Sequence, residues 1–92
     1  MSERHDGMLD GDLITIEANK EQKFGEVKNC SILIVNKDTT NNVLIGSQKT
    51  GKGFPLEPEE KIILRHYKKD TLYVFNPNAT AIQIKYLINP PK

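Results

Sequence analysis

The strongest constraint on the fold lies in residues 30–64, where short aliphatic runs alternate with turns rich in glycine, proline and asparagine. Runs of this kind favour β-strands, and the turn residues between them interrupt helices. No stretch between the runs carries the apolar period of an amphipathic helix. This order predicts an all-β chain in which successive strands run antiparallel.

The same pattern extends over most of the chain. We expect about seven short strands, and therefore a small antiparallel β-sandwich or barrel. The expected strands cover residues 13–18, 22–28, 32–35, 42–46, 62–67, 72–75 and 80–88. The last of them alternates most clearly, with Ile82, Ile84, Tyr86 and Ile88 predicted to point inward.

The length of the chain allows one such domain. A chain of 92 residues buries roughly 60–65% of its unfolded surface, which is enough for one modest core. We place this single β-sandwich domain at residues 12–89, followed by a C-terminal tail at 90–92. Residues 1–11 carry several charges and no aliphatic pattern, so we expect a flexible acidic arm there.

The overall composition points to no charged or lipid partner. The formal net charge is +1, which gives no field strong enough to favour nucleic acid or an anionic membrane. No apolar run approaches the ~18 residues of a membrane-spanning helix, and the first residues lack the apolar core of a signal peptide. The single cysteine, Cys30, excludes an internal disulfide, and we expect synthesis in a cytoplasm.

One segment imitates a nucleotide-binding loop. Residues 46–52 fit the spacing G-x-x-x-x-G-K and follow an expected strand. However, Gly53 stands where Ser or Thr must offer a hydroxyl to magnesium. Pro55 and Pro58 follow in a β-rich context, so the helix whose N-terminus binds phosphate cannot form there. We therefore predict that residues 46–52 bind no nucleotide.

The remaining reactive side chains form no catalytic or metal constellation. His5 and His66 lie far apart in sequence and have no clustered Cys or carboxylate ligands at metal spacing. Cys30 begins an apolar run and has no evident His partner, and the acidic turn at 57–60 is typical of a solvated surface. The sequence thus predicts no enzyme, no catalytic residue, no metal and no cofactor.

The run Ile32–Val35 is apolar at every position, although an antiparallel strand with one wet face should alternate. Only one parity can face the core of a two-layer sandwich. We therefore expect Leu33 and Val35 to lie under a loop or against another subunit.

Four further apolar residues are candidates for the same kind of contact. Phe54 and Leu56 flank Pro55, and we expect them to plug one end of the sandwich and to contribute to a subunit or partner interface. Met8 and Leu9 sit together among the carboxylates of the arm, which is the composition of a short clip that binds a neighbouring protein.

Single-stranded nucleic acid is the alternative partner that we weighed. A small OB-like barrel could stack bases on aromatic rings and hold the backbone with lysines. The lysines would be Lys49, Lys52, Lys68, Lys69 and Lys85, and the rings Tyr67, Tyr73, Phe75 and Tyr86. Trp is absent, and Tyr86 shares its parity with core residues, so we expect no nucleic-acid partner.

Five short motifs resemble small β-sandwich modules of tailed-phage virions: Ile34-Val35-Asn36, Leu44-Ile45-Gly46, Gly53-Phe54-Pro55-Leu56, Pro58-Glu59-Glu60 and Leu72-Tyr73. The resemblance covers about residues 30–88, and the chain departs from the pattern at residues 74–78, where a Gly-rich turn is expected. Modules of this kind serve in head-decoration proteins, head-fibre bases and tail or fibre components.

The resemblance implies a bacteriophage virion structural protein, synthesised in the host cytoplasm and located in the virion. We expect a capsid decoration or cement protein that forms a homo-oligomer, such as a trimer, and binds neighbouring virion proteins such as the major capsid protein. The first alternative is a tail, neck or fibre-base component. A small OB-like single-stranded nucleic-acid-binding protein is the more distant alternative.

Overall fold

The computed structural model describes residues 12–25, 27–47 and 53–89 of the chain. The arm at 1–11 and the tail at 90–92 lie outside these residues. The described residues form eight strands: β1 (Asp12–Ile16), β2 (Glu21–Gly25), β3 (Cys30–Asn36), β4 (Val43–Gly46), β5 (Phe54–Leu56), β6 (Lys61–Tyr67), β7 (Thr71–Phe75) and β8 (Ile82–Asn89).

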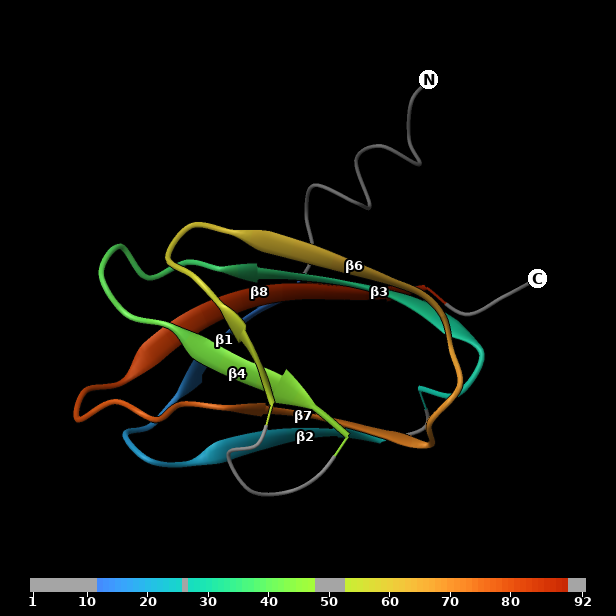
Figure 1. Ribbon diagram of the computed structural model, residues 1–92, viewed down its shortest axis with the longest axis horizontal. Coiled ribbons are helices and arrows are strands. Elements are labelled where there is room, and N and C mark those ends of the chain that lie inside the picture. The colour runs from blue at the N-terminus through green and yellow to red at the C-terminus, as the bar shows by residue number, and fades with distance from the viewer. Residues whose placement is uncertain (1–11, 26, 48–52, 90–92) are drawn as a thin grey trace.

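The strands build two four-stranded sheets that pack face to face (Figure 1). Sheet A has the order β1-β8-β3-β6, sheet B has the order β2-β7-β4-β5, and every pair of neighbours is antiparallel. This is the jelly-roll, or double-stranded β-helix, arrangement of eight strands. The prediction of an all-β antiparallel sandwich is confirmed.

The strand that sequence reasoning missed is β5. Its three residues flank a proline, and proline is tolerated only where no ladder hydrogen bond is needed, as in an edge strand. β5 occupies the edge of sheet B and pairs with β4 alone. It places Leu56 in the core with 2% of its surface exposed, so the predicted interface role of Leu56 is wrong.

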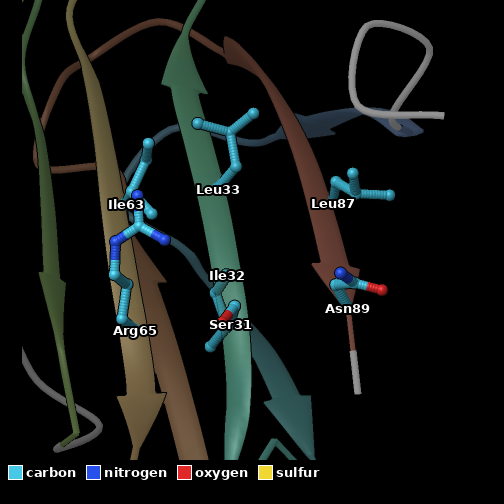
Figure 2. A pocket seen from close by; sticks show the side chains of 7 residues that line it. All are labelled: Ser31, Ile32, Leu33, Ile63, Arg65, Leu87 and Asn89. Carbon is cyan, nitrogen blue, oxygen red and sulfur yellow. The ribbon is translucent and has the colours of Figure 1, made fainter. Parts of the chain in front are cut away.

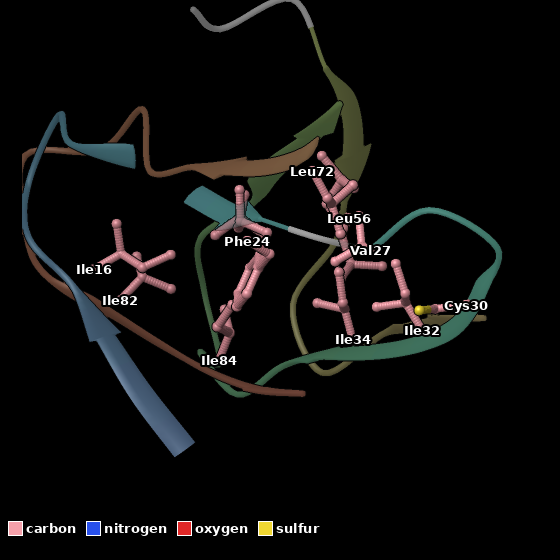
Figure 3. Packing of buried hydrophobic residues seen from close by; sticks show 13 residues of the cluster. Ile16, Phe24, Val27, Cys30, Ile32, Ile34, Leu56, Leu72, Ile82 and Ile84 are labelled. Carbon is pink, nitrogen blue, oxygen red and sulfur yellow. The ribbon is translucent and has the colours of Figure 1, made fainter. Parts of the chain in front are cut away.

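The core lies between the sheets and is filled by one face of each strand (Figure 3). In β3 the side chains of Ile32 and Ile34 are buried while Leu33 and Val35 are half-buried, as strand alternation requires. Ile82 and Ile84 are likewise buried, and Tyr86 and Ile88 pack against the same cluster, as predicted. The buried apolar residues are Ile16, Phe24, Val27, Cys30, Ile32, Ile34, Val43, Ile45, Leu56, Leu72, Val74, Ile82 and Ile84.

The two sheets are related by an internal pseudo-twofold arrangement. When β1, β2, β3 and β4 are exchanged with β5, β6, β7 and β8, the order of sheet A becomes that of sheet B read backwards. The turns at 17–20 and 57–60 match: in each, the fourth N–H donates to the first carbonyl, over 3.1 and 3.0 Å. Their third residues, Asn19 and Glu59, both have positive φ, of 59° and 62°. The described strands therefore form two halves of equivalent topology.

Four loops meet at one end of the sandwich, at the left of Figure 1. Two fully buried asparagines hydrogen-bond to backbone groups there. Asn36 ends β3, and Asn76 follows β7 at the equivalent position of the second half. The Nδ2 of Asn36 donates to the carbonyls of Asn41 (2.8 Å) and Leu56 (3.0 Å). Its Oδ1 accepts the N–H of Asp38 at 2.9 Å.

Asn76 repeats this pattern in the other half. Its Nδ2 donates to the carbonyls of Ile16 (2.9 Å), Glu17 (3.2 Å) and Thr80 (2.8 Å). Its Oδ1 accepts the N–H of Asn78 at 2.9 Å. Each asparagine thus satisfies backbone groups of its own loop and of an edge strand, β5 for Asn36 and β1 for Asn76.

The loop after Asn36 is also held by a carboxylate. Asp38 accepts hydrogen bonds from the N–H groups of Thr40 (3.0 Å) and Asn41 (2.7 Å). These hydrogen bonds hold the pKa of Asp38 below its usual value, and the bond from the Thr40 N–H has the largest effect.

Replacing Asn76 with alanine should destabilise the fold by roughly 2–4 kcal/mol, because several buried carbonyls lose their donor at once. Asn76→Asp should be at least as harmful, since it keeps the acceptor but turns an oxygen toward those carbonyls. Asn78→Ala provides a control, because it removes the hydrogen bonds of the Asn78 side-chain amide to the Asn42 carbonyl and to the Oδ1 of Asn76 but leaves the Asn76 amide bonded to its three carbonyls. It should cost far less. Urea denaturation followed by circular dichroism measures all three. Equal losses for Asn76→Ala and Asn78→Ala would contradict the role of the buried amide.

Gly53, the residue that breaks the nucleotide-loop pattern, has a structural reason to be glycine. A Cβ on Gly53 would lie 2.6 Å from the backbone N and O of Ile45, closer than atoms can approach. The chain then continues as strand β5 rather than as a helix. Gly53 is thus required by the close approach of the chain to β4.

Gly53→Ser restores the complete G-x-x-x-x-G-K-S spacing and provides a direct test. We expect it to destabilise the protein by about 1–3 kcal/mol, because the added atoms overpack against the backbone of Ile45. We also expect no nucleotide binding by calorimetry, with or without magnesium, for the wild type and the variant. Lys52→Ala is the control and should leave the denaturation midpoint unchanged. Magnesium-dependent ATP binding by either protein would refute this interpretation.

Candidate interaction surface on sheet A

The outer face of sheet A consists of the side chains of β1, β8, β3 and β6 that point away from sheet B. Strand register decides which these are, because residues directly opposite each other in an antiparallel pair share a face. They are Leu13, Thr15, Ser31, Leu33, Val35, Lys61, Ile63, Arg65, Gln83, Lys85, Leu87 and Asn89.

An apolar row crosses the middle of this face. Leu33 lies opposite Ile63 on one side and opposite Leu87 on the other. Val35 lies in the next row, and Leu13 is 54% exposed on the edge strand β1. Ile63 is 43% exposed, although it stands in the centre of a strand. Five large aliphatic side chains therefore share one solvent-facing surface.

The charges on this face are all positive. Lys61 and Lys85 lie on either side of Val35, and Arg65 follows Ile63 along β6. No Asp or Glu stands at an outward position of these four strands within the described residues. The face is thus apolar at its centre and cationic around it, which fits a partner that is apolar and acidic.

A shallow groove runs across this face (Figure 2). Its floor is β3 at Ser31–Leu33, and its sides are formed by Ile63 and Arg65 of β6 and by Leu87 and Asn89 of β8. It exists because Ser31 is small while its neighbours on both flanking strands are long. The volume is about 140 Å³.

The predicted interface residues are distributed over different places. Leu33 and Val35 lie on the outer face of sheet A, half-exposed. Phe54 is 67% exposed at the start of β5, on sheet B, and so does not join them. Met8 and Leu9 lie outside the described residues.

Sequence reasoning missed Ile63, Leu87 and Arg65. The sequence indicated Ile63 in part, because residues 62–64 are apolar at three consecutive positions and residues 32–35 at four. Their place beside Leu33, however, follows only from the pairing of β3 with β6 and β8.

The aromatic rings proposed for base stacking do not share a surface. Tyr86 packs against Phe24 in the core, with ring centroids 4.6 Å apart, and burial together with the nearby Asp12 carboxylate raises its pKa. Tyr67 is half-buried and donates its hydroxyl to the Thr71 carbonyl at 3.1 Å. Tyr73 and Phe75 lie on sheet B. The two-sheet jelly roll also differs from the five-stranded barrel of an OB fold.

Other sites are not evident in the described part of the chain. No group of three His, Cys, Asp or Glu side chains there lies close enough to hold a metal ion. Cys30 is buried in the core cluster. Nor do these residues form a helix long and apolar enough to cross a membrane.

Comparisons with known proteins bear on the fold alone. No protein-family model matches the chain, and no curated protein matches it. A solved structure, the solution NMR structure of a de novo designed double-stranded β-helix, superimposes with a TM-score of 0.63 at 14% sequence identity. The match covers 85% of this chain and 96% of the designed chain. It agrees with the jelly-roll topology of the two sheets.

Ile34 and Leu33, which are adjacent in β3, provide a test of which side chains belong to the core and which are free to contact a partner. Ile34→Asp should unfold the protein or cost several kcal/mol, because it puts a charge into a site with 0% exposure. Leu33→Asp, one position away on the outer face, should cost roughly 1 kcal/mol or less, because its carboxylate stays in water and beside cations. Urea denaturation midpoints measure both variants. A similar loss for the two would mean that Leu33 is part of the core.

Proposed function

We propose that this protein is a structural component of a bacteriophage virion, acting as a capsid decoration protein that oligomerises and binds neighbouring capsid proteins. The outer face of sheet A carries this proposal. A surface with five large aliphatic side chains and a cationic surround gains free energy when a partner covers it, by about 25 cal/mol for each Å² of apolar area.

Two further observations support the same function. The motifs that resemble virion modules fall on β3, β4, β5, the turn at 57–60 and β7, so they sit in both halves of the sandwich. The interior of the sandwich is filled by aliphatic side chains from both sheets. A sandwich with a packed core and an apolar, cationic outer face suits a protein that acts by binding other proteins.

Quantitative mass spectrometry of purified particles from the phage that encodes this chain tests the proposal. We expect hundreds of copies per particle, in keeping with a symmetric shell. A few copies to a few dozen would instead favour a tail, neck or fibre-base component. Absence of the chain from purified particles would refute the virion proposal.

A binding experiment tests the role of the outer face. We expect Leu33→Asp to lose cosedimentation with particles that lack the native chain. Thr15→Asp adds the same charge to the same face away from the groove, and it should bind like the wild type. Equal binding by Leu33→Asp and the wild type would exclude this face as the attachment surface.

A further inference from the structure

The groove on the outer face of sheet A has two chemically different halves. Leu33, Ile63 and Leu87 form an apolar half, while Ser31, Asn89 and the guanidinium-bearing Arg65 form a polar half (Figure 2). An apolar cavity of about 150 Å³ accommodates a molecule such as benzene. The groove, at about 140 Å³, is therefore large enough for one aliphatic side chain with a carboxylate next to it.

The charges on this face disfavour a symmetric face-to-face contact. Two copies of the outer face pressed together would bring Lys61, Arg65 and Lys85 of one copy against the same residues of the other. Like charges brought together in this way weaken association strongly. An occupant that carries carboxylates complements this face better.

The chain carries a segment with this chemistry directly before β1. In Asp6-Gly7-Met8-Leu9-Asp10 two large apolar residues stand between two carboxylates. The arm is acidic, whereas the outer face of sheet A is cationic among its described residues.

The position at which the arm joins the sandwich decides which groove Asp10 can reach. Asp12 shares one row of the sheet with Tyr86, Ile34 and Ile62. Ile62 is three strands away from Asp12 in this row, and Arg65 lies three residues further along β6. The Cα atoms of Asp12 and Arg65 are therefore about 17 Å apart. The two residues from Asp12 to Asp10 span at most ~7 Å. In one chain the Cα atoms of Asp10 and Arg65 therefore stay at least about 10 Å apart. An extended arm would also place Asp10 nearer to its own β1 than Leu9, whereas Arg65 lies farther from β1 than Leu87 and Leu33 of the apolar half. The arm of the same chain therefore matches the order of the groove poorly.

We propose that the groove binds residues 6–10 of a second copy of this chain, with the side chain of Leu9 in its apolar half and Asp10 paired with Arg65. This inference rests on the proposed function, since it names the contact by which the decoration protein links its own subunits. The contact is heterologous, because the arm of one copy enters the groove of the next, and it closes into a ring when the rotation permits.

Exchanging the charges of this pair in the full-length chain tests the proposal. Arg65→Glu and Asp10→Arg each place like charges together, so each variant alone should lose association by at least about tenfold. In a mixture of the two variants, the arm of Asp10→Arg meets a groove of opposite charge on Arg65→Glu. The unchanged arm of the Arg65→Glu variant likewise fits the unchanged groove of the Asp10→Arg variant. Light scattering should therefore show assemblies in the wild type and in the mixture, and monomers in each variant alone.

Lys23→Glu is the matched control, because it makes the same kind of charge reversal on the exposed surface of sheet B. It should assemble like the wild type, and circular dichroism should show that every variant is folded. A monomeric wild type, or single variants that assemble normally, would overturn the proposal. So would a mixture that stays monomeric, or a Lys23→Glu variant that dissociates. Since all these measurements are made in solution, they stand apart from the particle content on which the proposed function depends.

Discussion

The sandwich depends on how its backbone polar groups are satisfied where strands end and the chain crosses between sheets. At one end this is done by the side-chain amides of Asn36 and Asn76, each fully buried and bonded to backbone groups on both sides. A buried carbonyl without a donor costs as much as a lost hydrogen bond. Two amides thus hold the backbone of four loops together.

Much of this fold can be predicted from the alternation of apolar and polar residues along each strand. The rest cannot, because it depends on which strands pair with each other. Alternation identified the last strand and the inward parity of Ile82 and Ile84, because side-chain direction follows from backbone geometry alone. β5 escaped because three residues around Pro55 carry no periodicity. The neighbours of Leu33 escaped for another reason: Ile63 and Leu87 are distant in sequence, and only strand register brings them together.

The difference between local pattern and strand pairing also explains which expectations about the surface were correct. The apolar run Ile32–Val35 indicated that Leu33 and Val35 lie on the side of β3 away from Ile32 and Ile34, and they do. The sequence alone groups Leu56 with Phe54, because both flank a proline. However, Leu56 is 2% exposed, because it lies opposite Val43 in the core. Phe54 is 67% exposed, because it is the first residue of the three-residue strand β5. Burial at a sheet edge depends on where the strand stops, which composition does not encode.

The strand order also governs when this protein can become folded. β8, the last of the eight strands to be made, lies inside sheet A between β1 and β3, and pairs Asp12 with Tyr86 across most of the chain. Such distant pairings form slowly, because a long loop must close before any contact stabilises it. Until translation reaches Asn89, β1 and one edge of β3 have no partner, and their apolar side chains face the solvent or a chaperone. Sheet A is completed only after the ribosome has made the whole of β8.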